Sequence, residues 1–95
     1  MYHGAMATQS QALTAGGDPV NLVTTLTLSA GTTVSVQNVG LGTVFLAEAA
    51  AEPDPAMGPP AHVLERLMVL GIEVGSEGIW VWSPAQKGLL AVTEQ

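Results

Sequence analysis

Several features that this sequence lacks narrow its chemistry. It has no cysteine, which excludes disulfides and thiolate metal sites and leaves the redox compartment open. Two basic residues stand against eight acidic ones, a net charge of −6, and this argues against nucleic-acid binding, which needs Lys and Arg to neutralise phosphates. No apolar run approaches the roughly 20 residues of a transmembrane helix. No basic segment followed by an apolar one marks a signal peptide, so synthesis in the cytoplasm is expected.

Charge of either sign is also scarce. Charged residues make up 11% of the 95-residue chain, whereas hydrophobic residues make up 47%. A chain of this length forms one domain, near the small end of what folds without disulfides or metals. With so few charges, a monomer has little polar surface to present to water. The composition therefore predicts that part of the surface is buried in an assembly, with a homo-oligomer expected.

Motifs for catalysis or cofactor binding are missing as well. Gly40-Leu41-Gly42 does not extend into a dinucleotide fingerprint, and no phosphate-binding loop motif occurs. His62 has no Ser or Asp partner placed by a motif, which favours a surface hydrogen-bonding role. Glu52 and Asp54 supply two carboxylates where a hard cation takes six or more oxygens. We predict a non-enzymatic protein with no catalytic residue, no cofactor and no metal.

Alternation of apolar and polar residues marks three strands. Leucine and threonine alternate within residues 20–30, and valines 34 and 36 alternate with polar residues in 33–39. Residues 43–48 form the third candidate, and glycines separate the segments. Strands spaced by about ten residues predict an antiparallel sandwich or small barrel.

The last twenty residues read as a β-hairpin, with strands at 79–82 and 89–93 joined by a loop containing Ser and Pro. Trp80 and Trp82 share one face of the first strand, while the residues on its other face are also apolar. Such a strand needs cover on both sides. Three roles stay open for the tryptophans: core residues beneath a proline-rich loop, anchors at a protein interface, or a platform that stacks a sugar ring.

Three other segments complete the division of the chain. Residues 1–18 have no sustained period and are expected to form an extended N-terminal arm, either loose or ordered against a neighbouring subunit, with Met6 as a rival initiator to Met1. Residues 49–61 hold four of the six prolines and predict a long loop. Residues 62–70 fit either a strand or a short helix, and the alternation that follows in 72–74 favours a strand.

Parts of the sequence carry a resemblance to a known group. They are Val36-Gln-Asn-Val-Gly40 followed by Thr43–Glu48, the Ala/Pro loop at 49–60, and Ile79-Trp-Val-Trp-Ser83 leading to Leu90–Glu94. Together they resemble the small β-rich virion structural proteins of tailed bacteriophages and prophages, over residues 20–95. Leu67–Leu70 departs from that group, where a Pro-Gly turn is expected. The resemblance implies a building block without a shared binding site.

Taken together, the sequence predicts an all-β fold: a small antiparallel sandwich or barrel of about six to eight short strands, in one domain over 19–95. The function expected is a capsid decoration or cement subunit, in the virion, that contacts the major capsid protein or neighbouring copies and neither nucleic acid nor membrane. The alternatives are a head–tail connector, a tail-associated subunit, or a carbohydrate- or ligand-binding module of a host-recognition apparatus. The interface is expected to use Phe45, Pro53, Pro55, Met57, Pro59, Pro60, Trp80 and Trp82.

Overall fold

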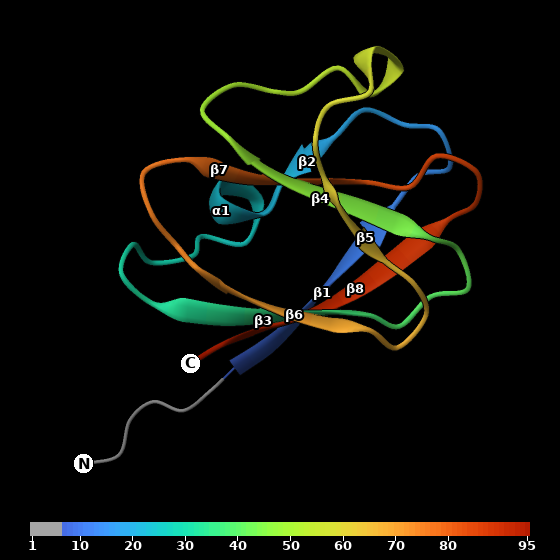
Figure 1. Ribbon diagram of the computed structural model, residues 1–95. Coiled ribbons are helices and arrows are strands. Elements are labelled where there is room, and N and C mark those ends of the chain that lie inside the picture. The colour runs from blue at the N-terminus through green and yellow to red at the C-terminus, as the bar shows by residue number, and fades with distance from the viewer. Residues whose placement is uncertain (1–6) are drawn as a thin grey trace.

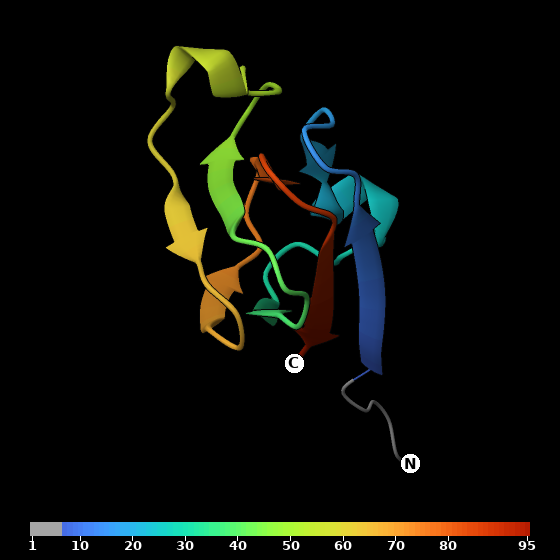
Figure 2. The same cartoon turned by 90° about the vertical axis from the view of Figure 1, so that its right-hand side faces the viewer.

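A computed structural model describes residues 7–95 and shows two layers of antiparallel strands (Figure 1, Figure 2). Its eight strands form two four-stranded sheets, so the predicted all-β sandwich and its strand number are confirmed. One sheet has the order β1-β8-β3-β6, with bounds Ala7–Leu13, Gly88–Glu94, Thr33–Asn38 and Val69–Glu73. The other has the order β2-β7-β4-β5, with bounds Val20–Asn21, Gly78–Trp82, Val44–Ala49 and His62–Leu64.

The core lies between the two sheets. As the alternation predicts, Val34 and Val36 of β3 point inward and are fully buried. From the opposite sheet, Leu46 of β4 and Val81 of β7 are fully buried too. Each such aliphatic side chain contributes about 1.5–3 kcal/mol through burial, which makes this layer the main source of stability.

The predicted C-terminal hairpin is wrong, although both of its strands exist. β7 pairs with β2 and β4, whereas β8 pairs with β1 and β3, so the two strands lie in different sheets. The connection crosses from one sheet to the other at Ser83, which is buried and whose hydroxyl donates to the carbonyls of Thr43 and Gln86. Each strand therefore finds its partners elsewhere in the chain, which the local pattern does not reveal.

The long strand predicted over residues 20–30 is also wrong. Only Val20–Asn21 is extended, and a one-turn helix α1 (Leu22–Thr25) follows. Asn21 starts the helix, because its side-chain oxygen accepts the N–H of Val23 at 3.0 Å. Thr27 ends it in the left-handed region (φ 55°), which lets the N–H of Leu28 bond the Val23 carbonyl at 3.0 Å. This short element is far from membrane-spanning length, and no helix within residues 7–95 is long and apolar enough to cross a bilayer.

The other two open segments resolve as strands. Residues 7–13 form β1, which pairs along its whole length with β8, so an extended arm is the wrong description for this part of 1–18; residues 1–6 lie outside the described range. Residues 62–70 are extended rather than helical, as favoured, but a turn at 65–68 divides them into β5 and the start of β6. These two strands are edges of different sheets.

Candidate interaction surfaces

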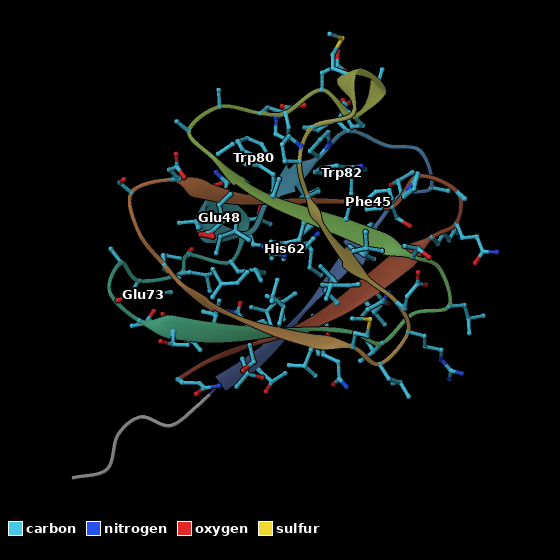
Figure 3. All side chains as sticks on the ribbon, in the orientation of Figure 1. Phe45, Glu48, His62, Glu73, Trp80 and Trp82 are labelled. Atoms are coloured by element: carbon cyan, nitrogen blue, oxygen red, sulfur yellow. The ribbon has the colours of Figure 1, made fainter. Side chains whose placement is uncertain are left out.

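The tryptophans lie on the outer face of the β2-β7-β4-β5 sheet, beneath the proline-rich segment (residues 49–61; Figure 3). Phe45 and Trp82 are paired across β4 and β7, with ring centroids 5.8 Å apart and planes tilted by 51°. The indole N–H of Trp80 donates to the Ala49 carbonyl at 3.0 Å. Trp82 is only 5% exposed. The face that the sequence offers to a partner is thus largely covered by the chain itself.

Local hydrogen bonds shape the covering segment. The Asp54 carboxylate accepts the N–H of Ala56 at 3.0 Å and caps a 3-10 turn, η1 (Pro55–Met57), which ends at Gly58 with φ 64°. Between the segment and the sheet lies an open cavity of about 190 Å³, lined by Phe45, Pro55, Gly58, Pro59, Ala61, Val63 and Trp82.

Half of the residues predicted for the interface therefore meet at one cavity. Phe45, Pro55, Pro59 and Trp82 line it, whereas Trp80 does not. The remaining three, Pro53, Met57 and Pro60, lie on the covering segment. Met57 is 79% exposed. The exposed Met57 side chain is available to a protein partner, whereas the covered aromatic rings are not.

A second surface, which the sequence does not single out, is an apolar end of the sandwich. It consists of five exposed side chains on the β3–β4 connection, the β5–β6 turn and the first residues of β6 and β8: Leu41, Leu67, Met68, Val69 and Leu89. The β3–β4 connection and the β5–β6 turn lie at the right of Figure 1. Leu67 and Val69 are each 58% exposed and Leu41 is 78% exposed. Exposed apolar side chains gathered in one place often mark an interaction site. The Leu67–Leu70 run reads in the sequence as the interior of a strand, so its exposure escapes detection.

Asn38 holds the segments of the apolar end together. Its side chain is fully buried, and its amide nitrogen donates to the carbonyls of Gly42 and Leu64, both at 2.8 Å. Its amide oxygen accepts the N–H of Gly40 at 3.0 Å, and its backbone carbonyl accepts the N–H of Leu67 at 2.6 Å. One residue thus fixes both the β3–β4 connection and the β5–β6 turn, and the apolar end is preorganised.

Leu67 adopts a left-handed conformation (φ 70°) at the tip of that turn. For a residue with a Cβ this conformation costs about 1–2 kcal/mol, and glycine is the usual choice. This is where the resemblance described above implies a Pro-Gly turn. The chain instead presents a leucine to solvent at an energetic cost, as residues in functional surfaces often do.

A third surface is the outer face of the β1-β8-β3-β6 sheet, called here the open face because no described segment lies over it (Figure 2). Its residues alternate with buried ones along each strand and include a single charge: Thr8, Ser10, Ala12, Thr33, Ser35, Gln37, Val69, Gly71, Glu73, Leu89, Ala91 and Thr93. The hydroxyls of Thr8 and Thr93 lie 2.8 Å apart across β1 and β8. Edge strands of monomers usually carry charges that discourage association, and here the edge strands β1 and β6 contribute only Glu73 to this face.

Among the titratable side chains, the Glu94 carboxylate has a structural role. The Glu94 carboxylate accepts the N–H of Ser29 at 2.9 Å and the hydroxyl of Thr32 at 3.2 Å. The Ser29 N–H, above all, holds the pKa of Glu94 below its ordinary value. His62 is exposed at the start of β5. Within residues 7–95, no group of three His, Asp or Glu side chains gathers that could hold a metal ion.

The fold and these surfaces define the class: a small antiparallel β-sandwich with one aromatic face covered by its own loop and one open face that carries a single charge. No protein-family model and no curated protein sequence matches the chain. Among solved structures, the crystal structure of PirA is similar, with a TM-score of 0.60 and 14% identity, over 98% of this chain and 97% of PirA. At that identity the similarity shows a shared fold.

Proposed function

We propose that this chain is a non-enzymatic structural subunit that packs into a larger protein assembly through its open face and its apolar end. The observation that carries this proposal is the open face: twelve outward residues on four strands with one carboxylate among them. Eight of the twelve are Ser, Thr, Ala or Gly, so most of this face has little side-chain entropy to lose and one charge to desolvate on contact. Such a face suits close packing against another protein.

The assembly we propose is a bacteriophage virion, with the chain as a capsid decoration or cement subunit. The support is the resemblance of residues 20–95 to small β-rich virion proteins, together with the low charge and the exposed apolar end. In that setting the open face lies on the major capsid protein and the ends meet neighbouring subunits. A head–tail connector or tail-associated subunit uses the same surfaces.

The anchor of this assembly differs from the one the sequence indicates. Trp82 is 5% exposed and Trp80 is partly buried, so little of either ring is left for a partner. Area removed from water at about 25 cal/mol per Å² must come from exposed groups. We therefore assign the anchoring role to the apolar end, with exposed Met57 as the part of the proline-rich segment that can contribute.

Light scattering of the purified protein over a concentration series tests this proposal. We expect a particle heavier than a monomer, and we expect Ser35→Lys with Ala91→Lys, two charges on the open face, to reduce its mass. Ala50→Lys with Ala51→Lys adds the same charge at exposed sites outside the proposed surfaces and is the matched control. A monomer at every concentration, unchanged in all variants, would argue against assembly through these surfaces.

A ligand-binding module is the second candidate, and the aromatic cavity favours it. The rings of Phe45 and Trp82 and two prolines surround about 190 Å³, which suits one ring of a sugar or another small ligand. Titration of glycans monitored by tryptophan fluorescence separates the two functions. Saturable quenching or a spectral shift supports the module, whereas an unchanged spectrum leaves the structural subunit.

A further inference from the structure

The two basic residues of this chain and three of its eight acidic residues lie at opposite ends of the sandwich. Both basic residues of the sequence lie on connections at the apolar end: Arg66 in the β5–β6 turn and Lys87 just before β8. Both are exposed. The carboxylate of Glu65, in the same turn, accepts the hydroxyl of Thr43 at 2.9 Å. The apolar end thus carries two cationic side chains beside exposed leucines and a methionine.

The opposite end carries an acidic hollow of about 300 Å³, lined by Glu48, Glu73, Gly75, Ser76 and Glu77. Figure 3 shows Glu48 and Glu73 at the left of the molecule, away from the β5–β6 turn. The β3–β6 register places Glu73 opposite Thr33, at the start of β3, and Val69 opposite Gln37, near its end. The two ends are therefore separated along the strands by at least about 13 Å, the rise of four residues.

We propose that a second copy of this chain docks head-to-tail, with the apolar end of one copy in the acidic hollow of the next. This inference rests on the proposed structural role and names the neighbouring partner within it. Arg66 and Lys87 then face three carboxylates, which gives the contact its orientation. Leu67 and Met68, at the tip of the turn, meet the small side chains of Gly75 and Ser76.

Charge selects this arrangement over a symmetric one. In a two-fold contact between apolar ends, Arg66 and Lys87 of one copy approach the same two residues of the other, and like charges oppose association. A head-to-tail contact joins two different surfaces. It therefore leaves one free surface at each end of any open chain of copies, and it closes only as a ring or continues as a filament.

Paired charge reversals test the contact, with sedimentation velocity as the measurement. Arg66→Glu with Lys87→Glu makes both ends acidic, and Glu48→Lys with Glu77→Lys, two hollow residues outside the open face, makes both ends basic. We expect each double variant alone to weaken association by about tenfold or more. An equimolar mixture restores it, because each end then meets the opposite charge. The quadruple variant keeps the net charge of −6 and also associates.

A control separates the contact from general charge effects. Asp18→Lys with Glu52→Lys alters the net charge as much as the Glu48/Glu77 variant does, at exposed sites outside the hollow, and should leave association unchanged. Far-ultraviolet circular dichroism and a thermal melt check that every variant folds. A folding defect cannot produce the expected result, because a misfolded variant would not regain association in the mixture or in the quadruple variant.

Three outcomes overturn the proposal. They are a wild-type chain that stays monomeric up to about 1 mM, an equimolar mixture that fails to associate, and a Glu48/Glu77 variant that associates as the wild type does. The proposed function has its own test in the open-face lysines. If those variants disrupt a wild-type oligomer while the charge reversals have no effect, the structural role stands and the head-to-tail contact falls. If the charge reversals behave as expected and the open-face lysines do nothing, the role assigned to that face falls.

Discussion

At the scale of single residues, Asn38 is a buried amide at the end of a valine strand. A buried polar group lowers stability unless it is hydrogen-bonded, and Asn38 has partners for its amide nitrogen and oxygen. Replacing it removes the donor to the buried carbonyls of Gly42 and Leu64, and it leaves the N–H of Gly40 with only its 3.2 Å bond to the Leu89 carbonyl. Its value to the molecule lies in fixing the apolar end, so stability and assembly are linked at this one position.

We expect Asn38→Leu to lower the free energy of unfolding by about 3 kcal/mol or more, since each orphaned buried group costs about 1–3 kcal/mol. Urea denaturation followed by tryptophan fluorescence measures the loss. Gln37→Ala, one residue earlier and on the open face, removes a single exposed hydrogen bond to Leu67 and should cost less than about 1 kcal/mol. Equal losses in the two variants would contradict the role of Asn38.

Glu94 gives the molecule a defined response to acid. Its folded-state pKa is lowered by the Ser29 N–H, so its ionised form stabilises the fold. This stabilisation is present above the ordinary carboxyl pKa and is lost as pH falls through the lowered value. The free-energy difference between wild type and Glu94→Gln should therefore be largest near neutral pH and shrink below about pH 4.5. Urea midpoints from pH 7 to pH 3 measure it, and a difference that stays constant would refute the effect.

At the scale of elements, the proline-rich segment works as a lid on the aromatic face. Its 3-10 turn and two of its prolines lie at the cavity above Phe45 and Trp82. Because this cover belongs to the same chain, the Trp–Phe pair forms a second, smaller apolar layer outside the main core. Strand β7, which is apolar on both faces, is thus covered by the other sheet on one face and by the proline-rich segment on the other.

Trp82→Ala should therefore destabilise the isolated subunit by about 3–5 kcal/mol, the usual cost of removing a buried tryptophan. Met57→Ala, at an exposed site on the same segment, should change stability by less than about 0.5 kcal/mol. Thermal denaturation at a concentration where the protein is monomeric makes the comparison. A Trp82→Ala variant that keeps monomer stability and loses only assembly would instead make this ring an interface anchor.

The elements also show what the sequence reveals and what it hides. β3 is predictable because its valines alternate with polar residues, and β4 is predictable because a short apolar run follows the glycines at 40 and 42. The Leu/Thr alternation of 20–30 fails as a guide, since Asn21 capping and the turn at Thr27 override it. The false hairpin has a topological reason: pairing partners of β7 and β8 lie far away in the sequence. For the candidate surfaces, the sequence identifies the aromatic residues but does not show that residues 49–61 cover them. The apolar end can be recognised only from the structure, which shows the turn that exposes Leu67.

At the scale of the whole molecule, two asymmetries coincide. One sheet has its outer face covered and aromatic, while the other has its outer face open and carries a single charge. One end is apolar and cationic while the other is an acidic hollow. A body with two distinct faces and two distinct ends can lie on a large surface and still contact neighbours in one direction. This combination of surfaces is why we place the chain in an ordered assembly rather than in a simple dimer.

Salt separates the two contributions to contacts between copies. Raising ionic strength from about 0.05 M to 0.5 M shortens the screening length to well under 10 Å, which weakens exposed charge pairs. Apolar burial does not weaken under the same change. If Arg66 and Lys87 orient the contact against the acidic hollow, the dissociation constant should rise by about tenfold over that range. The quadruple charge-reversed variant should show the same dependence, because its pairs are inverted and otherwise equivalent. Sedimentation velocity at matched protein concentrations measures both proteins, and association that is unchanged or tighter in high salt would leave apolar burial alone as the source of the contact.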